Sequence, residues 1–153
     1  MPPASSVPDL TAHLGYWLRY VSNHVSQAFA RKVEAYGVTA AEWVLMRQLL
    51  GEEALPPSRL AERMGMTRGA ISKLADRLIA KSLMERTANP EDGRAHTLAL
   101  TPAGRALVPE LAALADANDA EFFDQLAPKD RAALFRILRE VVEKRGLKSV
   151  PVA

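Results

Sequence analysis

The sequence contains no cysteine among its 153 residues. Disulfide crosslinks, thiolate metal sites and sensing by oxidation of the chain's own thiols are therefore excluded. It also lacks a run of eighteen apolar residues, and its first ten residues lack the basic and then apolar stretch of a signal peptide. We expect a cytoplasmic protein without membrane contact.

Signatures of catalysis are missing as well. The chain has no G-x-S-x-G motif and no glycine-rich phosphate loop, and it contains only three histidines. On one helix His13 and His24 would lie roughly 16 Å apart, too far to bind one metal ion within a monomer, and His96 is isolated from both. The sequence therefore predicts no enzyme, no metal site and no cofactor.

The net charge is small, at +2, but its distribution is uneven. Residues 57–105 hold nine basic against five acidic residues, a net charge of +4, whereas the rest of the chain has a net charge of −2. A basic middle between mildly acidic flanks is typical of a nucleic-acid-binding segment on a scaffold. An unevenly charged solvated surface is the alternative, and charge alone does not distinguish the two.

The chain does contain strong helical periodicity, and its apolar content of 48% is enough for one compact domain. Residues 1–8, with three prolines and two serines, predict a flexible arm. From Asp9 to Tyr36 apolar residues recur at helical spacing, which predicts one long helix. Gly37 should end it.

Three shorter helices are predicted next. Thr39 begins the first, and Glu42 three residues later completes a capping box. Pro57 begins the second, which Gly65 ends after barely two turns. Thr67 caps the third, which should end near residues 81–82.

The pattern then changes to that of a β-hairpin. Residues 83–87 and 96–101 have strand-like patterning, and NPEDGR between them is rich in turn-forming residues. Two short helices joined by a tight turn and followed by a two-stranded ribbon predict a winged helix-turn-helix. Ala61 allows the helices to approach closely, and Ile71 fills the angle between them.

Two helices complete the chain. Pro102 begins a long one that reaches about Leu126, in which Pro109 predicts a bend. Pro128 begins the last helix, and Gly146 ends it. The predicted fold class is mainly α with a small β-hairpin wing. A winged helix-turn-helix lobe is interlocked with a helical dimerisation layer in one domain, the lobe being residues 37–101 and the layer residues 9–36 and 102–148.

The helix that begins at Thr67 has a polar exposed face that suits the major groove of DNA. We expect Arg68 and Ser72 to contact base edges, with guanine as the target of Arg68. Thr67, Lys73 and Arg77 are expected to contact phosphates. For each of them, an ordinary solvent-exposed side chain is the alternative.

The predicted hairpin tip carries a further basic residue. Arg94 could enter an adjacent minor groove, where negative potential is concentrated, and Asp92 could hold it by a charge-assisted hydrogen bond. An ordinary turn with a solvated arginine is the alternative.

The stretch SRLAERMGMTRGAISKLADRLIAKSLMERTANPEDGRAHTLALTPAG resembles the DNA-binding segment of the MarR (multiple antibiotic resistance regulator) family. The shared features are the helix pair, an L-x-E-R turn into the wing, a D-x-R wing tip and an L-T-x-x-G exit into a long helix. The resemblance implies a homodimer with interlocked terminal helices and a small-molecule effector bound between lobe and dimer layer. By this resemblance Arg94 is the wing arginine and Asp92 its partner, while Gly93 replaces a more common basic residue.

The terminal helices are more apolar than a small lobe needs for its own core. We expect a dimer interface there, formed by Leu10, Leu14, Leu134, Ile137, Leu138 and Val141. A two-fold dimer predicts an inverted-repeat operator with half-sites about one helical turn apart.

An effector site is expected along the first helix, where four side chains recur at helical spacing and two more could face them from the next helix. These are His13, Trp17, Tyr20 and His24, with Trp43 and Met46. Aromatic walls suit a flat aromatic or anionic ligand. Packing of these amphipathic side chains beneath the dimer layer is the alternative.

The sequence therefore predicts a sequence-specific double-stranded DNA-binding transcription regulator, and the resemblance implies a repressor released by an effector. The alternative is a winged-helix module whose basic face binds an acidic protein. Steep salt dependence and sequence dependence of duplex binding would distinguish DNA binding from this alternative.

Overall fold

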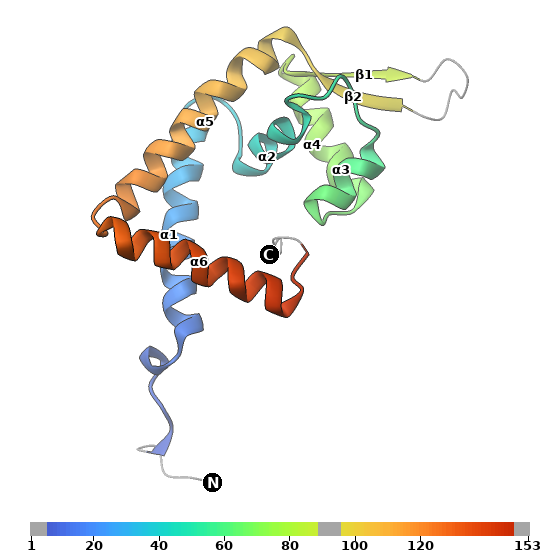
Figure 1. Cartoon of the computed structure of the whole chain (residues 1–153). Coiled ribbons are helices and arrows are strands. Elements are labelled where there is room, and N and C mark those ends of the chain that lie inside the picture. The colour runs from blue at the N-terminus through green and yellow to red at the C-terminus, as the bar shows by residue number, and fades with distance from the viewer. Residues whose placement is uncertain (1–5, 89–95, 149–153) are drawn as a thin grey trace.

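The structure is a computed structural model, and it describes residues 6–88 and 96–148. After a 3-10 turn at Leu10–Ala12, its helices and strands, in chain order, are α1 (Leu14–Glu34), α2 (Ala40–Leu49), α3 (Pro57–Met64), α4 (Arg68–Ala80), β1 (Met84–Ala88), β2 (His96–Leu100), α5 (Pro102–Phe123) and α6 (Pro128–Arg145). Figure 1 shows α2, α3, α4 and the hairpin gathered into a lobe, from which α1 and α5 extend, and α6 runs from the far end of α5 across the view below the lobe. None of the described helices is long and apolar enough to cross a membrane.

The hydrophobic core lies mainly in the lobe and continues onto α1 and α5. Its buried side chains include Leu45 of α2, Leu60 of α3, Leu78 of α4, Leu98 of β2 and Leu111 of α5. Full burial of one such aliphatic side chain contributes about 1.5–3 kcal/mol. This shared core gives the two short helices and the hairpin one fixed arrangement.

The predicted helix-turn-helix is confirmed in its local detail. Gly65 ends α3 in the left-handed conformation, with φ of 62°, and the Thr67 side chain accepts a hydrogen bond from the Ala70 N–H at 3.1 Å. Ala61 and Ile71 are both buried, as the close approach of α3 and α4 requires. The capping box of Thr39 and Glu42 is present at the start of α2.

The predicted hairpin is also confirmed, and it has an additional partner. β1 and β2 are antiparallel, with Met84 opposite Leu100. Leu55, in the connection between α2 and α3, forms a bridge to Leu98 with two backbone hydrogen bonds of 3.0 and 2.8 Å. This contact anchors the base of the wing to the lobe.

The prediction that the first long helix begins at Asp9 is wrong. The Asp9 carboxylate accepts the N–H of Leu10 at 2.9 Å and caps a single 3-10 turn at Leu10–Ala12. His13 is then extended, so α1 begins only at Leu14. The Asp9 side chain therefore caps this local turn, and it does not cap the first turn of the long helix.

The terminal helices agree with the predicted order. α5 is helical on both sides of Pro109, so the predicted bend there stays a prediction, and the helix ends at Phe123. Gly146 ends α6 with φ of 64°. α6 has no buried residue, because within one chain few side chains pack against it.

Candidate nucleic-acid interface

Helix α4 buries one face in the lobe and presents the other to solvent. Its buried residues are Ile71, Leu74, Ala75 and Leu78. Arg68, Lys73 and Arg77 are exposed on the other side, and Ser72 is half-buried. The side chains predicted to read bases and to bind phosphates therefore lie away from the buried face of α4, as the helical periodicity predicted.

The cations of this face are not neutralised within the described part of the chain. Arg68, Lys73 and Arg77 form no ion pair with another described residue. Arg68 is the first residue of α4, where the helix dipole and free N–H groups also favour negative charge. The start of α4 is thus an electropositive, solvent-accessible surface.

Thr67 has a structural role beside any role at the surface. Its hydroxyl oxygen accepts the Ala70 N–H and so caps α4. The hydroxyl hydrogen stays available for donation, because accepting one bond uses only a lone pair of the oxygen. Thr67 can therefore cap the helix and still donate to a phosphate.

An ion pair joins α4 to the wing, and the sequence offered no signal for it. Arg86 of β1 donates from Nη2 to Asp76 Oδ1 of α4 at 3.0 Å. Asp76 is the one acidic residue within α4. Its pairing with Arg86 leaves the positive charge of Arg68, Lys73 and Arg77 uncompensated on this helix.

The wing itself projects beyond the helices of the lobe, as Figure 1 shows for β1 and β2. The predicted tip residues Asp92 and Arg94 lie outside the residues that the structure describes. Their minor-groove role accordingly stays a prediction.

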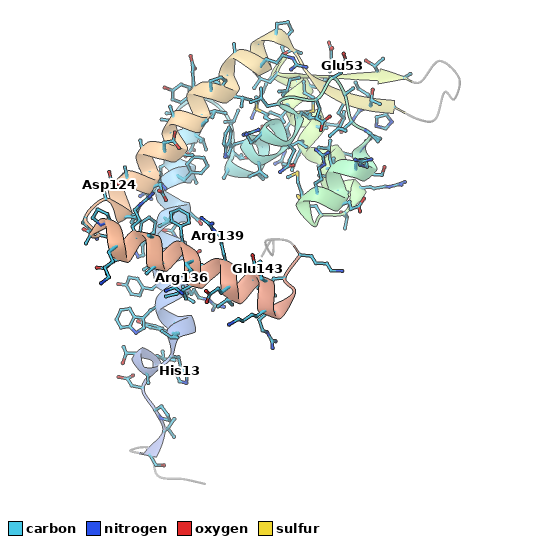
Figure 2. The ribbon with its side chains drawn as sticks, viewed as in Figure 1. His13, Glu53, Asp124, Arg136, Arg139 and Glu143 are labelled. Carbon is cyan, nitrogen blue, oxygen red and sulfur yellow. The ribbon has the colours of Figure 1, made fainter. Side chains whose placement is uncertain are left out.

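Three of the predicted effector-site side chains share one exposed face of α1. The rings of Tyr20 and His24 stack with centroids 5.3 Å apart, and Trp17 lies 6.2 Å from Tyr20. His13 precedes the helix, and Figure 2 shows it at the end of α1 far from the lobe. The grouping of His13 with this face is corrected, because its backbone is extended.

The other two predicted effector residues do not face this aromatic surface within one chain. Met46 is 0% exposed and belongs to the core, so it cannot line a pocket. Trp43 packs edge-on against Phe29, with ring centroids 6.3 Å apart. Phe29 lies nine residues after Tyr20 on α1, which is roughly 13 Å of helix rise. The six predicted residues therefore do not form one site.

Trp43 instead lines a different hollow of about 240 Å³ between α1, α2 and α5. Its other lining residues are Val25, Ser26, Phe29, Ala115, Asn118 and Asp119. Sequence periodicity could not find this site, because α5 lies far along the chain from α1 and α2.

The polar groups around the hollow are largely engaged. Asn118 is buried; it accepts from Lys32 Nζ at 2.8 Å and donates to the Val25 carbonyl oxygen at 3.1 Å. Asp119 accepts from Arg131 of α6 at 2.5 Å. The hollow thus has aromatic walls and one charged lining residue, Asp119.

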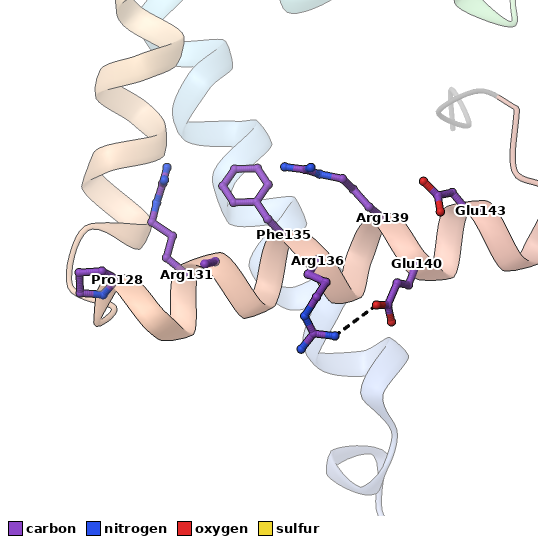
Figure 3. Close-up of a pocket in the computed structure, with 8 residues that line it drawn as sticks. Pro128, Arg131, Phe135, Arg136, Arg139, Glu140 and Glu143 are labelled. Carbon is purple, nitrogen blue, oxygen red and sulfur yellow. Dashed lines mark hydrogen bonds and ion pairs between the residues drawn. The ribbon is translucent and has the colours of Figure 1, made fainter.

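A larger hollow, of about 590 Å³, follows α6 alone. Figure 3 shows Arg131, Phe135 and Arg139 on one side of this helix and Arg136, paired with Glu140, on the other. The guanidinium carbons of Arg131 and Arg139 lie 5.2 and 5.3 Å from the centre of the Phe135 ring. All of its lining residues come from one helix, so it is an open surface and not a site built between elements.

Comparison with known proteins identifies relatives of the whole arrangement. Residues 38–96 match the model of the MarR family. The HTH-type transcriptional repressor MdtR of Bacillus subtilis is 29% identical over 147 residues, which cover 96% of this chain and 85% of that protein.

Solved structures share the fold. A probable transcriptional regulator from Pseudomonas aeruginosa superposes with a TM-score of 0.76 at 26% identity, covering 87% of this chain and 99% of that one. Bordetella bronchiseptica BpsR, whose DNA binding is regulated by 6-hydroxynicotinic acid, has a TM-score of 0.76 at 25% identity, covering 89% of this chain and 97% of that one.

Proposed function

We propose that the chain belongs to the MarR family, whose model matches residues 38–96, and that it is a dimeric, sequence-specific double-stranded DNA-binding transcription regulator. The observation that carries this function is the exposed face of α4. Arg68, Lys73 and Arg77 lie there without an ion-pair partner among the described residues, on a helix seated in the lobe core.

The contacts with DNA are divided along α4. Arg68, at the start of the helix, reads a base edge in the major groove, and half-buried Ser72 reads beside it. Thr67, Lys73 and Arg77 bind phosphates and set the register. Arg94, held by Asp92, enters the minor groove from the wing.

A second copy of the chain covers the terminal helices. Leu14 is 83% exposed, and Ile137, Leu138 and Val141 of α6 are all exposed in the single chain. Large apolar side chains exposed in this way on α1 and α6 favour association. A two-fold pair of lobes then requires an inverted-repeat operator.

Repression is released by a small aromatic effector in the hollow at Trp43. Phe29 and Trp43 offer the apolar walls that a flat ring requires. Asp119, the charged lining residue, is paired with Arg131 of α6, so the lining does not select between a neutral and an anionic ring. The relative from Bordetella bronchiseptica, whose DNA binding responds to a pyridine carboxylic acid, supports regulation by a small ring compound.

The test is selection of binding sites from random duplex DNA by the full chain, at low salt and with or without a panel of aromatic metabolites. We expect an enriched inverted repeat, steep weakening of binding with salt, and release by a member of the panel. Enrichment of no sequence would favour the alternative, a winged-helix module that binds acidic proteins. Release by no member would contradict the effector alone.

A further inference from the structure

Glu42, at the start of α2, is the most deeply buried charged side chain among the described residues, with 1% of its surface exposed. Its carboxylate oxygen Oε1 accepts the Thr39 N–H at 3.2 Å in the capping box. A capping box needs no burial and no countercharge, because it works at exposed helix ends. The burial of this carboxylate therefore calls for a second role.

Lys81, at the end of α4, supplies the countercharge. Its Nζ donates to both carboxylate oxygens of Glu42, at 2.7 and 3.0 Å. Its backbone N–H closes the last turn of α4 with bonds to the carbonyl oxygens of Arg77 and Ile79. The pair thus attaches the end of α4 to the start of α2 through two hydrogen bonds.

The residue after Glu42 belongs to the hollow. Trp43 packs edge-on against Phe29 of α1 and lines the hollow with Asn118 and Asp119 of α5. A displacement of Trp43 would move the first turn of α2, which also carries Glu42, because four helical residues share one rigid turn. One helical turn therefore connects the hollow to the end of α4.

We propose that the Glu42–Lys81 ion pair is a positioning element that couples the hollow at Trp43 to the orientation of α4. This inference rests on the proposed DNA binding and adds the route by which the hollow and the operator affect each other. A pair with short, charge-assisted bonds to a buried carboxylate suits this role, since such hydrogen bonds are directional. Coupling of this kind is reciprocal, so operator binding must also change the surroundings of Trp43.

The test uses Trp43 as the reporter. The chain has two tryptophans, so Trp17→Phe leaves Trp43 as the sole one. Titration of this full-length dimer with the selected operator duplex is expected to change the emission of Trp43. In the Glu42→Gln/Lys81→Met double variant the operator still binds at saturating concentration, but the change in emission is lost.

Affinity provides a second measurement. Glu42→Gln keeps an acceptor for the Thr39 N–H, and we expect it to lower the ratio of operator to random-duplex affinity about tenfold, within the usual range of coupling between sites. Adding Lys81→Met should lower the ratio little further, because the coupling is already lost. Lys81→Arg, which keeps the charge, should preserve most of the ratio.

Several results would overturn the proposal. Lys81 could bind a phosphate directly; then Lys81→Met would weaken all duplexes alike and Glu42→Gln would leave the ratio unchanged. An unchanged Trp43 response in the double variant, or no response in the parent that binds operator, would also contradict the coupling. Failure of the parent to select any duplex would instead contradict the proposed function.

A matched control separates this pair from ion pairs in general. Glu52 pairs with Arg63 at 3.2 Å in the same lobe but does not join α2 to α4. Glu52→Gln should leave the Trp43 response and the affinity ratio as in the parent. Urea unfolding of every variant ensures that comparisons are made on folded protein.

Discussion

Gly104, in the first turn of α5, lies directly against the backbone of Leu83 at the junction between α4 and the wing. A Cβ at Gly104 would overlap the Leu83 carbonyl oxygen and would lie 3.3 Å from Leu100 Cδ2. Thr101 binds the same junction, since its hydroxyl donates to the Ser82 carbonyl oxygen at 2.7 Å. The start of α5 and the end of α4 are therefore held as one unit.

This contact predicts that Gly104→Ala destabilises the protein. The added methyl group meets backbone atoms, which move less readily than a side chain, so we expect a loss of about 2 kcal/mol or more in the free energy of unfolding. Urea denaturation measures it. Gly15→Ala on α1 is the control: nothing lies within 4 Å of that position, and no loss is expected. Equal effects of the two substitutions would contradict the close contact.

Ser82 predicts the opposite effect. It is the one residue other than glycine with positive φ, 61°, among residues 6–88 and 96–148. Ser82→Gly removes the steric cost of the left-handed conformation and should raise the free energy of unfolding by about 0.5–1 kcal/mol. Ser82→Ala, which keeps a Cβ, should bring no gain. A loss of stability in Ser82→Gly would mean that the hydroxyl contributes a contact of its own.

Two substitutions on α4 should separate base reading from phosphate binding. Arg68→Ala is expected to cost about 1–3 kcal/mol of discrimination and to relax preference at one operator position. Lys73→Ala should weaken all duplexes alike and reduce the salt slope by about one. Binding titrations on operator and random duplexes at several salt concentrations measure both. Lys129→Ala, on exposed α6, is the control and should change neither quantity.

Leu138→Glu should shift the protein from dimer to monomer. A carboxylate introduced into an apolar interface loses hydration without gaining a partner, so association becomes unfavourable. Analytical ultracentrifugation gives the oligomeric state, and operator affinity should fall with it. Val44→Glu substitutes a comparably exposed apolar residue of α2, outside the proposed interface. Dissociation by Val44→Glu, or a persistent dimer in Leu138→Glu, would place the interface elsewhere.

The order of elements was predictable because its signals are local. The cap at Thr67, the left-handed turn at Gly65 and the box at Thr39 each depend on a few consecutive residues, and all three occur as predicted. The same applies to the polar face of α4, which helical periodicity alone places opposite Ile71. The start of α1 was mispredicted because Asp9 could cap either a short turn or a long helix.

The proposed effector site was predictable only in part. Trp43 lines a hollow, but its neighbours there, Phe29 and Asn118, come from elements that approach only after folding. Met46, at helical spacing from Trp43, proved to be core. Periodicity states which residues share a face, and it does not state what that face meets.

The sequence alone determined that Gly104 stands at the start of the helix that follows the wing, although not that it contacts Leu83. It determined likewise the helix-turn-helix, the hairpin and the basic face of α4, since these follow from caps, turns and periodicity. Only the tertiary structure decided that Gly104 presses on Leu83, Arg86 pairs with Asp76, and Lys81 reaches Glu42. The physical reason is that packing of the shared core brings these distant residues together, and no local signal encodes which partners will meet.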